Sequence, residues 1–384
     1  MTPILISSEK KIVFVFLCLA CITISFNVAA LAAVLPSIAR EFAIDDLVVS
    51  RVIFLYMIPY GIFALMYAPL TKYVSYKNLL VVGMLFYGVM SLYCSVAETV
   101  QGLLVGRVMT GLSGACAIPL GLIIIGKLFS YQQRGRTVGM LFSSSFIASM
   151  AGLITSGLFH WRVLFLIPGI TGILTAMGIL LVRMEVLNNT HKTEISYIHA
   201  IKQSDIQRVF IFILCISALY HGVHNWMGIY IKRLYILPQL YISIIFIAKA
   251  LCGAAGQIIG GFIADKKSRY FACLLGVIVL ALATISLPFI HFIGAFIVIL
   301  CLMTAGWTIG HNGISTYLTD FPETYRPQIA SLNSSVRFIA GGIGFYMSGF
   351  LVQKGFPQAF LTLGILMALN ALFLKFVMAP QKRK

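Results

Sequence analysis

Charged residues are scarce in this chain of 384 residues: Asp, Glu, Lys and Arg make up 10% of it, whereas hydrophobic residues make up 60%. Soluble globular domains contain roughly 25% charged residues, and the mean hydropathy of +0.98 is far above what a soluble core of this length needs. The composition therefore excludes a soluble protein. It predicts an all-α integral membrane protein instead.

Several sequence patterns that would indicate other activities are also missing. The chain has no GxxxxGK[ST] loop for ATP, no nucleophile elbow and no metalloprotease helix, so we expect neither primary pumping nor an enzyme. All eight cysteines lie in apolar runs, where they act as small core residues rather than as a disulfide framework. His221 and His224 have the spacing of a metal pair, but no acidic or thiol ligand accompanies them. We therefore expect no metal and no cofactor.

Twelve apolar segments are long enough to span a bilayer, which takes about 20 residues per helix. The first resembles a signal peptide but is too long for one, and we expect it to stay as a helix that Pro36 ends. The longest polar interval, 183–207, predicts a cytoplasmic linker between two six-helix bundles, 1–182 and 208–384. The predicted spans are 12–35, 48–68, 79–97, 100–126, 137–158, 163–182, 208–230, 240–263, 271–289, 291–318, 329–351 and 359–378.

The positions of the basic residues predict the orientation. With the amino terminus inside, most of the 28 Lys and Arg residues fall in cytoplasmic loops and tails, as the positive-inside rule requires. Both termini are then cytoplasmic. The net charge of +17 follows from this topology, so nucleic acid is not an expected partner. We expect a monomer that crosses the lipid bilayer of a bacterial inner membrane many times.

Short basic loops recur at corresponding places in the two halves, at 68–77 and 261–270. Two six-helix bundles with related loops are typical of a parallel repeat, in which the substrate site lies between the repeats near the membrane midplane. A set of motifs on this framework resembles the major facilitator superfamily over nearly the whole chain. The loop motif G-x-x-x-D-R/K-x-G-R is matched, with Ser268 in place of the last glycine, by Gly261, Asp265, Lys266 and Arg269.

Further motifs are similar to the twelve-helix drug:proton antiporter branch of that family. Arg107, Gly111 and Pro119 match its fourth-helix pattern, and segments 27–36 and 331–342 match patterns in its first and eleventh helices. The resemblance implies a secondary active transporter of a small organic solute, working by alternating access of the two bundles. It also implies that Gly261, Asp265, Lys266 and Arg269 form a gating loop.

The chain departs from the antiporter pattern where acids are expected. Asn27 stands in place of the first-helix acid, and Lys72 in place of the aspartate of the first loop. All eleven acids fall in loops or at span ends, whereas Arg107, Lys249 and Arg337 lie inside predicted spans. Such buried cations must be hydrated, neutralised or matched by an anionic ligand.

We therefore expect an anionic or amphipathic substrate, of the organic acid or carboxylate siderophore type. Multidrug efflux by proton antiport is the alternative, and a channel is the alternative of another class. Histidines can carry protons near neutral pH without a carboxylate, so His221, His224 and His311 are candidates for proton coupling. The expected substrate-binding residues are Arg107, Lys249, Arg337, Asn27, Asn225, Trp226, Trp307 and Asn312.

Overall fold

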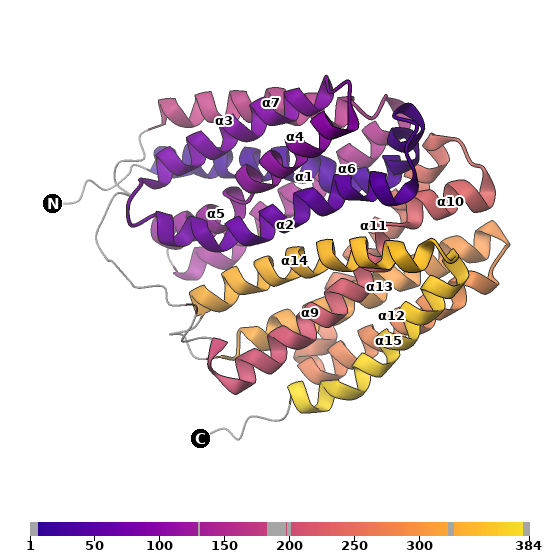
Figure 1. Ribbon diagram of the computed structural model, residues 1–384. Helices are drawn as coiled ribbons and strands as arrows, with labels where there is room; N and C mark the ends of the chain where they lie inside the picture. The colour runs from indigo at the N-terminus through magenta and orange to yellow at the C-terminus, as the bar shows by residue number, and fades with distance from the viewer. Residues whose placement is uncertain (1–6, 130, 183–196, 198–200, 322–325, 379–384) are drawn as a thin grey trace. The chain divides into compact units, whose positions relative to one another are not determined.

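A computed structural model describes residues 7–129, 131–182, 197, 201–321 and 326–378. The chain divides into two compact units, Met1–Ile195 (unit 1) and Ser196–Lys384 (unit 2). Regular structure in the described ranges is entirely helical (Figure 1). Twelve helical segments there are long and apolar enough to cross a membrane, six in each unit. The prediction of an all-α protein with twelve transmembrane helices is therefore confirmed.

Unit 1 contains seven helices within the described residues, because one of its six spans is broken into two helices. Most bounds lie within a few residues of the predicted spans. The helices are α1 (Ser7–Glu41), α2 (Asp46–Leu70), α3 (Tyr76–Ser95), α4 (Val100–Gly114), α5 (Ala117–Leu128), α6 (Tyr131–Leu158) and α7 (Val163–Leu181).

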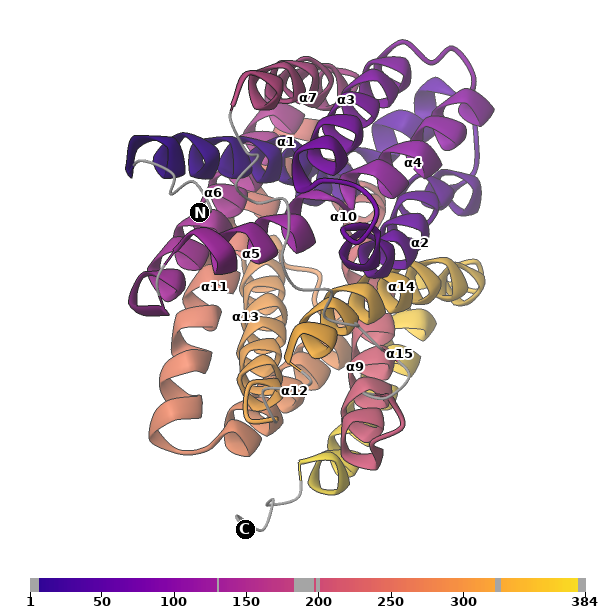
Figure 2. The same ribbon diagram turned by 90° about the vertical axis from the view of Figure 1, so that its left-hand side faces the viewer.

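Unit 2 likewise has one broken span in its described part, and one helix that ends in a single 3₁₀ turn. Figure 2 shows α9 beside α15 and α13 beside α12. The elements are α9 (Ser204–His224), α10 (Met227–Tyr235), α11 (Gln239–Lys266), α12 (Arg269–Ser286), η2 (Leu287–Phe289), α13 (Ile293–Leu318), α14 (Arg326–Val352) and α15 (Phe356–Val377).

The two broken spans were predicted as continuous helices, and both predictions were wrong in this respect. Between α4 and α5 the helix is interrupted at Ala115 and Cys116. Pro119 has no N–H to donate to the Ala115 carbonyl one turn earlier, which weakens the helix there. Between α9 and α10 the interruption lies at Asn225 and Trp226, where no proline is present.

Two predicted boundaries also need correction. The first helix does not end at Pro36 but continues through it to Glu41. α9 begins at Ser204, so its first turn lies inside the segment 183–207 that was predicted as linker. Residues 183–196 and 198–200 of that segment lie outside the described residues.

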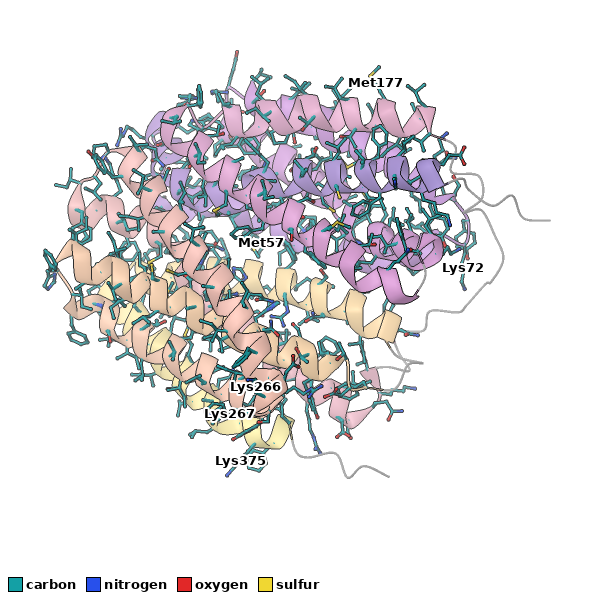
Figure 3. The ribbon with its side chains drawn as sticks, turned by 180° about the vertical axis from the view of Figure 1, so that it is seen from behind. Met57, Lys72, Met177, Lys266, Lys267 and Lys375 are labelled. Atoms are coloured by element: carbon teal, nitrogen blue, oxygen red, sulfur yellow. The ribbon has the colours of Figure 1, made fainter. Side chains whose placement is uncertain are left out.

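Glycines allow the closest helix contacts in each unit. In unit 1, a Cβ on Gly111 of α4 would overlap the carbonyl oxygen of Tyr56 on α2. In unit 2, a Cβ on Gly276 of α12 would overlap the backbone of Gly310 on α13. Because lipid provides no hydrophobic drive between helices, this close van der Waals packing is what holds such pairs together. Other helix faces carry exposed apolar side chains: Figure 3 shows Met177, whose side chain points outward from α7.

Candidate functional site

In unit 1, Arg107 of α4 is buried, with 1% of its surface exposed. Its Nε donates a hydrogen bond to the Val52 carbonyl of α2 at 2.9 Å. Its guanidinium carbon lies 4.2 Å from the ring centroid of Tyr56 and 5.5 Å from that of Phe165. Nη1 has no hydrogen-bond partner in the described structure. Arg107 is thus positioned by a backbone carbonyl and aromatic faces, with Nη1 left unpartnered.

Other polar side chains lie buried around Arg107 without well-formed hydrogen bonds to the described residues. Tyr87 of α3 lies beside Asn27 of α1 and Ser91 of its own helix. The unpartnered atoms are both amide atoms of Asn27, the hydroxyls of Tyr56, Tyr87 and Ser91, and Arg107 Nη1. A buried polar group without a partner costs roughly 1–3 kcal/mol, so such a group normally contacts water or a ligand. We call these five residues the unit 1 polar cluster.

In unit 2, an aromatic and histidine cluster joins α9 to α13. Tyr220 and Trp307 stack with ring centroids 4.1 Å apart and an interplanar angle of 1°. The Tyr220 hydroxyl and His224 Nδ1 are hydrogen-bonded at 2.7 Å. His221 lies 6.0 Å from Trp307, and His311 lies 5.8 Å from it, between centroids. The structure therefore brings together the three predicted proton-coupling histidines and Trp307.

Arg337 of α14 borders this cluster. Its Nε donates to Asn333 Oδ1 at 2.8 Å, and its Nη2 lies 3.5 Å from Ser315 Oγ. Its guanidinium carbon is 5.9 Å from the Trp307 centroid. A cavity of about 10 Å³ is lined by Arg337, Trp307 and His311, which is room for about one water molecule. Arg337 thus has polar partners, but no carboxylate is among those described.

Lys249 of α11 is 3% exposed, and its Nζ has no hydrogen-bond partner in the described structure. Nζ lies 3.9 Å from the ring centroid of Phe246, which in turn is 6.4 Å from the His224 ring. Lys249 is therefore held over an aromatic face beside the histidines. We call Tyr220, His221, His224, Lys249, Trp307, His311 and Arg337 the unit 2 cluster.

Three residues predicted to bind substrate lie outside this cluster, and two of them make structural hydrogen bonds. The Trp226 indole is fully buried and donates to Ser348 Oγ at 2.9 Å. Asn312 donates to the Gln257 carbonyl at 2.8 Å, which ties α13 to α11. Asn225 is buried at the break between α9 and α10, and its amide nitrogen is unpaired among the described residues.

The predicted gating loop lies at the turn between α11 and α12. Arg269 pairs with Asp320, with 2.7 Å between Nε and Oδ2. Asp265 is exposed, and Lys266 Nζ lies 4.3 Å from the ring centroid of Phe262. Gly261 approaches Asn312 closely enough that a Cβ would touch its amide. The pair between Arg269 and Asp320 was not foreseen, because Asp320 belongs to no part of the loop motif.

Sequence reasoning also missed several aromatic members of the two clusters. Tyr220 precedes His221 and is one turn from His224, so its place on the same helix face could have been noticed. Phe246 is similarly one turn before Lys249. Tyr56 and Tyr87 meet Arg107 only through helix packing, which leaves no local signal in the sequence. In the part of the chain that the structure describes, no group of three His, Cys, Asp or Glu residues could hold a metal ion.

A family model described as Major Facilitator Superfamily matches residues 15–345. The chain belongs to the major facilitator superfamily. It is 23% identical over 334 residues to the uncharacterised MFS-type transporter YwfA of Bacillus subtilis, covering 83% of this chain and 80% of that protein. It is 21% identical to a probable L-galactonate transporter of Escherichia coli, covering 88% and 82%.

A solved structure shows the same fold. The inward-facing, occupied form of a bacterial homolog of the human lysosomal transporter Spinster superposes with a TM-score of 0.81, at 15% identity, over 97% of each chain. This major facilitator protein is thus a multi-pass membrane transporter of a family that is not enzymatic, and a small molecule is the kind of substrate that such a family implies.

Proposed function

We propose that this transporter is a secondary active carrier of a small organic anion, working by alternating access of residues 1–182 and 208–384. One observation carries the proposal: the described spans contain buried or half-buried cations but no acid in their interior. Each described acid lies in a loop or at a span end, at Glu9, Glu41, Asp45, Asp46, Glu98, Asp205, Asp265 and Asp320. The cations are Arg107, Lys249 and Arg337.

The cost of burying a charge supports an anionic substrate. An ion that is taken out of water loses several kcal/mol of hydration free energy unless a partner compensates for it. Neither Arg107 nor Lys249 has a carboxylate partner among the described residues. A bound carboxylate would accept hydrogen bonds from Arg107 Nη1 or Lys249 Nζ. A lipophilic cation would instead be repelled at both places. The similarity to a probable L-galactonate transporter points to the same organic acid class.

We further propose that the histidines of the unit 2 cluster couple transport to protons. The Tyr220 hydroxyl and His224 form a hydrogen bond between two titratable side chains of this cluster. Arg337 of α14 and His311 of α13 lie beside Trp307, which stacks on Tyr220. Lys249 of α11 lies over Phe246, which borders the His224 ring. A proton on His224 would lie beside Lys249, and an incoming anion would stabilise both charges. The expected result for His224→Gln is loss of proton-driven accumulation with substrate binding retained.

The first experiment measures ligand-dependent thermal stabilisation of the purified protein. The panel contains citrate, gluconate and other organic acids together with lipophilic cations. We expect stabilisation by at least one organic anion in the wild type, and loss of that stabilisation in Lys249→Met. The matched control is Lys232→Met, because the Lys232 ammonium is half-buried but bonds the Leu237 carbonyl at 2.7 Å.

Transport in proteoliposomes then tests the carrier mechanism. A carrier exchanges labelled for unlabelled anion across the membrane, whereas a channel gives flux without counterflow. Stabilisation by lipophilic cations that is indifferent to Lys249→Met would overturn the anion proposal and indicate multidrug efflux. Flux without counterflow would overturn alternating access.

A further inference from the structure

A groove of about 760 Å³ lies between α9 and α15 of unit 2. Its walls run from Arg208 to Leu219 on α9 and from Leu366 to Val377 on α15. All lining residues are apolar apart from Arg208 and Asn370. The transport mechanism proposed above does not use this groove, because neither cluster contributes a side chain to it.

The length of the groove matches one leaflet of a bilayer. Arg208 and Leu219 are eleven residues apart, as are Leu366 and Val377, which is about 17 Å along a helix axis. The hydrocarbon core of a bilayer is about 30 Å thick, so one leaflet contributes about 15 Å. The helices are antiparallel, and the start of α9 lies at the same end as the end of α15 (Figures 1 and 2). With Arg208 at the membrane surface, a groove of this length would reach about the bilayer midplane.

The surface end of the groove is basic. The Arg208 side chain is 58% exposed and has only a loose ion pair with Asp205, with 3.8 Å between Nη1 and Oδ1. Lys375 is exposed, and its Nζ lies 4.9 Å from the centroid of Phe376, which is part of the groove wall. Figure 3 shows Lys375 at the same end of unit 2 as Lys266 and Lys267. Two cations thus flank the mouth of an apolar groove one leaflet long.

We propose that this groove is a binding site for one phospholipid with an anionic head group. The acyl chains lie along the apolar walls between α9 and α15, and the phosphate lies between Arg208 and Lys375. Any lipid-facing surface contacts acyl chains, so the distinguishing property is selectivity for the head group. Each basic residue near a membrane surface contributes about 1 kcal/mol to anionic lipid binding. With Asp205 offsetting part of this, we expect a preference of about tenfold for an anionic over a zwitterionic lipid.

Native mass spectrometry of the full-length protein tests the proposal. The probes are palmitoyl-oleoyl phosphatidylglycerol and phosphatidylcholine, which have the same acyl chains. The wild type is expected to retain one phosphatidylglycerol about ten times more strongly than phosphatidylcholine. The double variant Arg208→Gln/Lys375→Gln is expected to lose this preference. Lys267→Gln, at the same end but outside the groove, is the charge control and is expected to keep it.

A second pair of variants tests the apolar walls. Leu369→Trp fills the groove and is expected to weaken the binding of both lipids. Leu251→Trp changes a similarly exposed leucine outside the groove and is expected to have no effect on lipid binding. Thermal unfolding without added lipid verifies that each variant is folded. Equal retention of the two lipids by the wild type would overturn the proposal, as would selectivity that survives the double variant. A dimer that Leu369→Trp dissociates would show that a second copy occupies the groove instead.

Discussion

Substituting Lys249 by methionine should make the protein more stable while removing its ability to bind an anion. Methionine has similar length and keeps the contact with Phe246, because sulfur interacts favourably with aromatic rings. The ammonium of Lys249 has no hydrogen-bond partner in the described structure and lies 3.9 Å from the ring centroid of Phe246. The substitution therefore removes a buried polar group without breaking a polar contact.

The size of the effect follows from these contacts. An unpartnered buried polar group costs about 1–3 kcal/mol, and an uncompensated charge costs several. The cation–π contact with Phe246 returns up to about 2 kcal/mol, of which methionine keeps roughly half through its sulfur. The expected net gain is about 1–2 kcal/mol. For a unit of this size, that corresponds to an increase in Tm of about 2–8 °C.

The assay is thermal unfolding of purified wild type and Lys249→Met in the same detergent, without substrate. Lys232→Met provides the contrast, because its ammonium bonds the Leu237 carbonyl, and we expect its Tm to fall or stay unchanged. A lower Tm for Lys249→Met would refute the reasoning. It would mean that the ammonium has a favourable partner in the resting protein, and that no anion is needed to compensate it.

Two further predictions concern packing in unit 1 and surface ion pairs in both units. Gly111→Ala should destabilise the protein by several kcal/mol, because the new Cβ would overlap a backbone carbonyl of α2. Gly126→Ala, whose Cβ would have nothing within 4 Å, should be neutral or stabilising by up to about 1 kcal/mol. Thermal unfolding of both variants measures the difference. Glu41→Gln should lower stability by about 1–2 kcal/mol, because Glu41 accepts two hydrogen bonds from Arg162 and such charge-assisted bonds are strong. Asp205→Asn, in an exposed pair, should change it by well under 1 kcal/mol, and equal effects of the two variants would contradict this ranking.

The transmembrane helices could be predicted because each is specified locally, by about 20 consecutive apolar residues. The break at Ala115 also had a local cause in Pro119, but a proline inside a span does not always break it: α1 continues through Pro36 and α7 through Pro168. At the break between α9 and α10, the Trp226 indole donates to Ser348 of α14. That contact joins residues far apart in the chain, so no local pattern predicts it.

The candidate site also combines features that the sequence could predict with contacts between distant residues that it could not. The absence of acids from the span interiors can be read from the sequence, and every acid that the structure describes lies in a loop or at a span end. That Lys249 lies above Phe246, one turn earlier, follows from helix geometry and could have been noticed. That Trp307 stacks on Tyr220 of another helix could not.

The same distinction explains why Asn312 and Lys249, both predicted to bind substrate, differ in the structure. Each is a polar residue inside an apolar run, and membrane burial requires each to find a partner. Asn312 finds one in the carbonyl of Gln257, so its polarity is used for packing α13 on α11. Lys249 finds none among the described residues, so its polarity remains available for a ligand. A polar residue in a span becomes a strong candidate for substrate binding only when the structure shows that no helix contact has satisfied it.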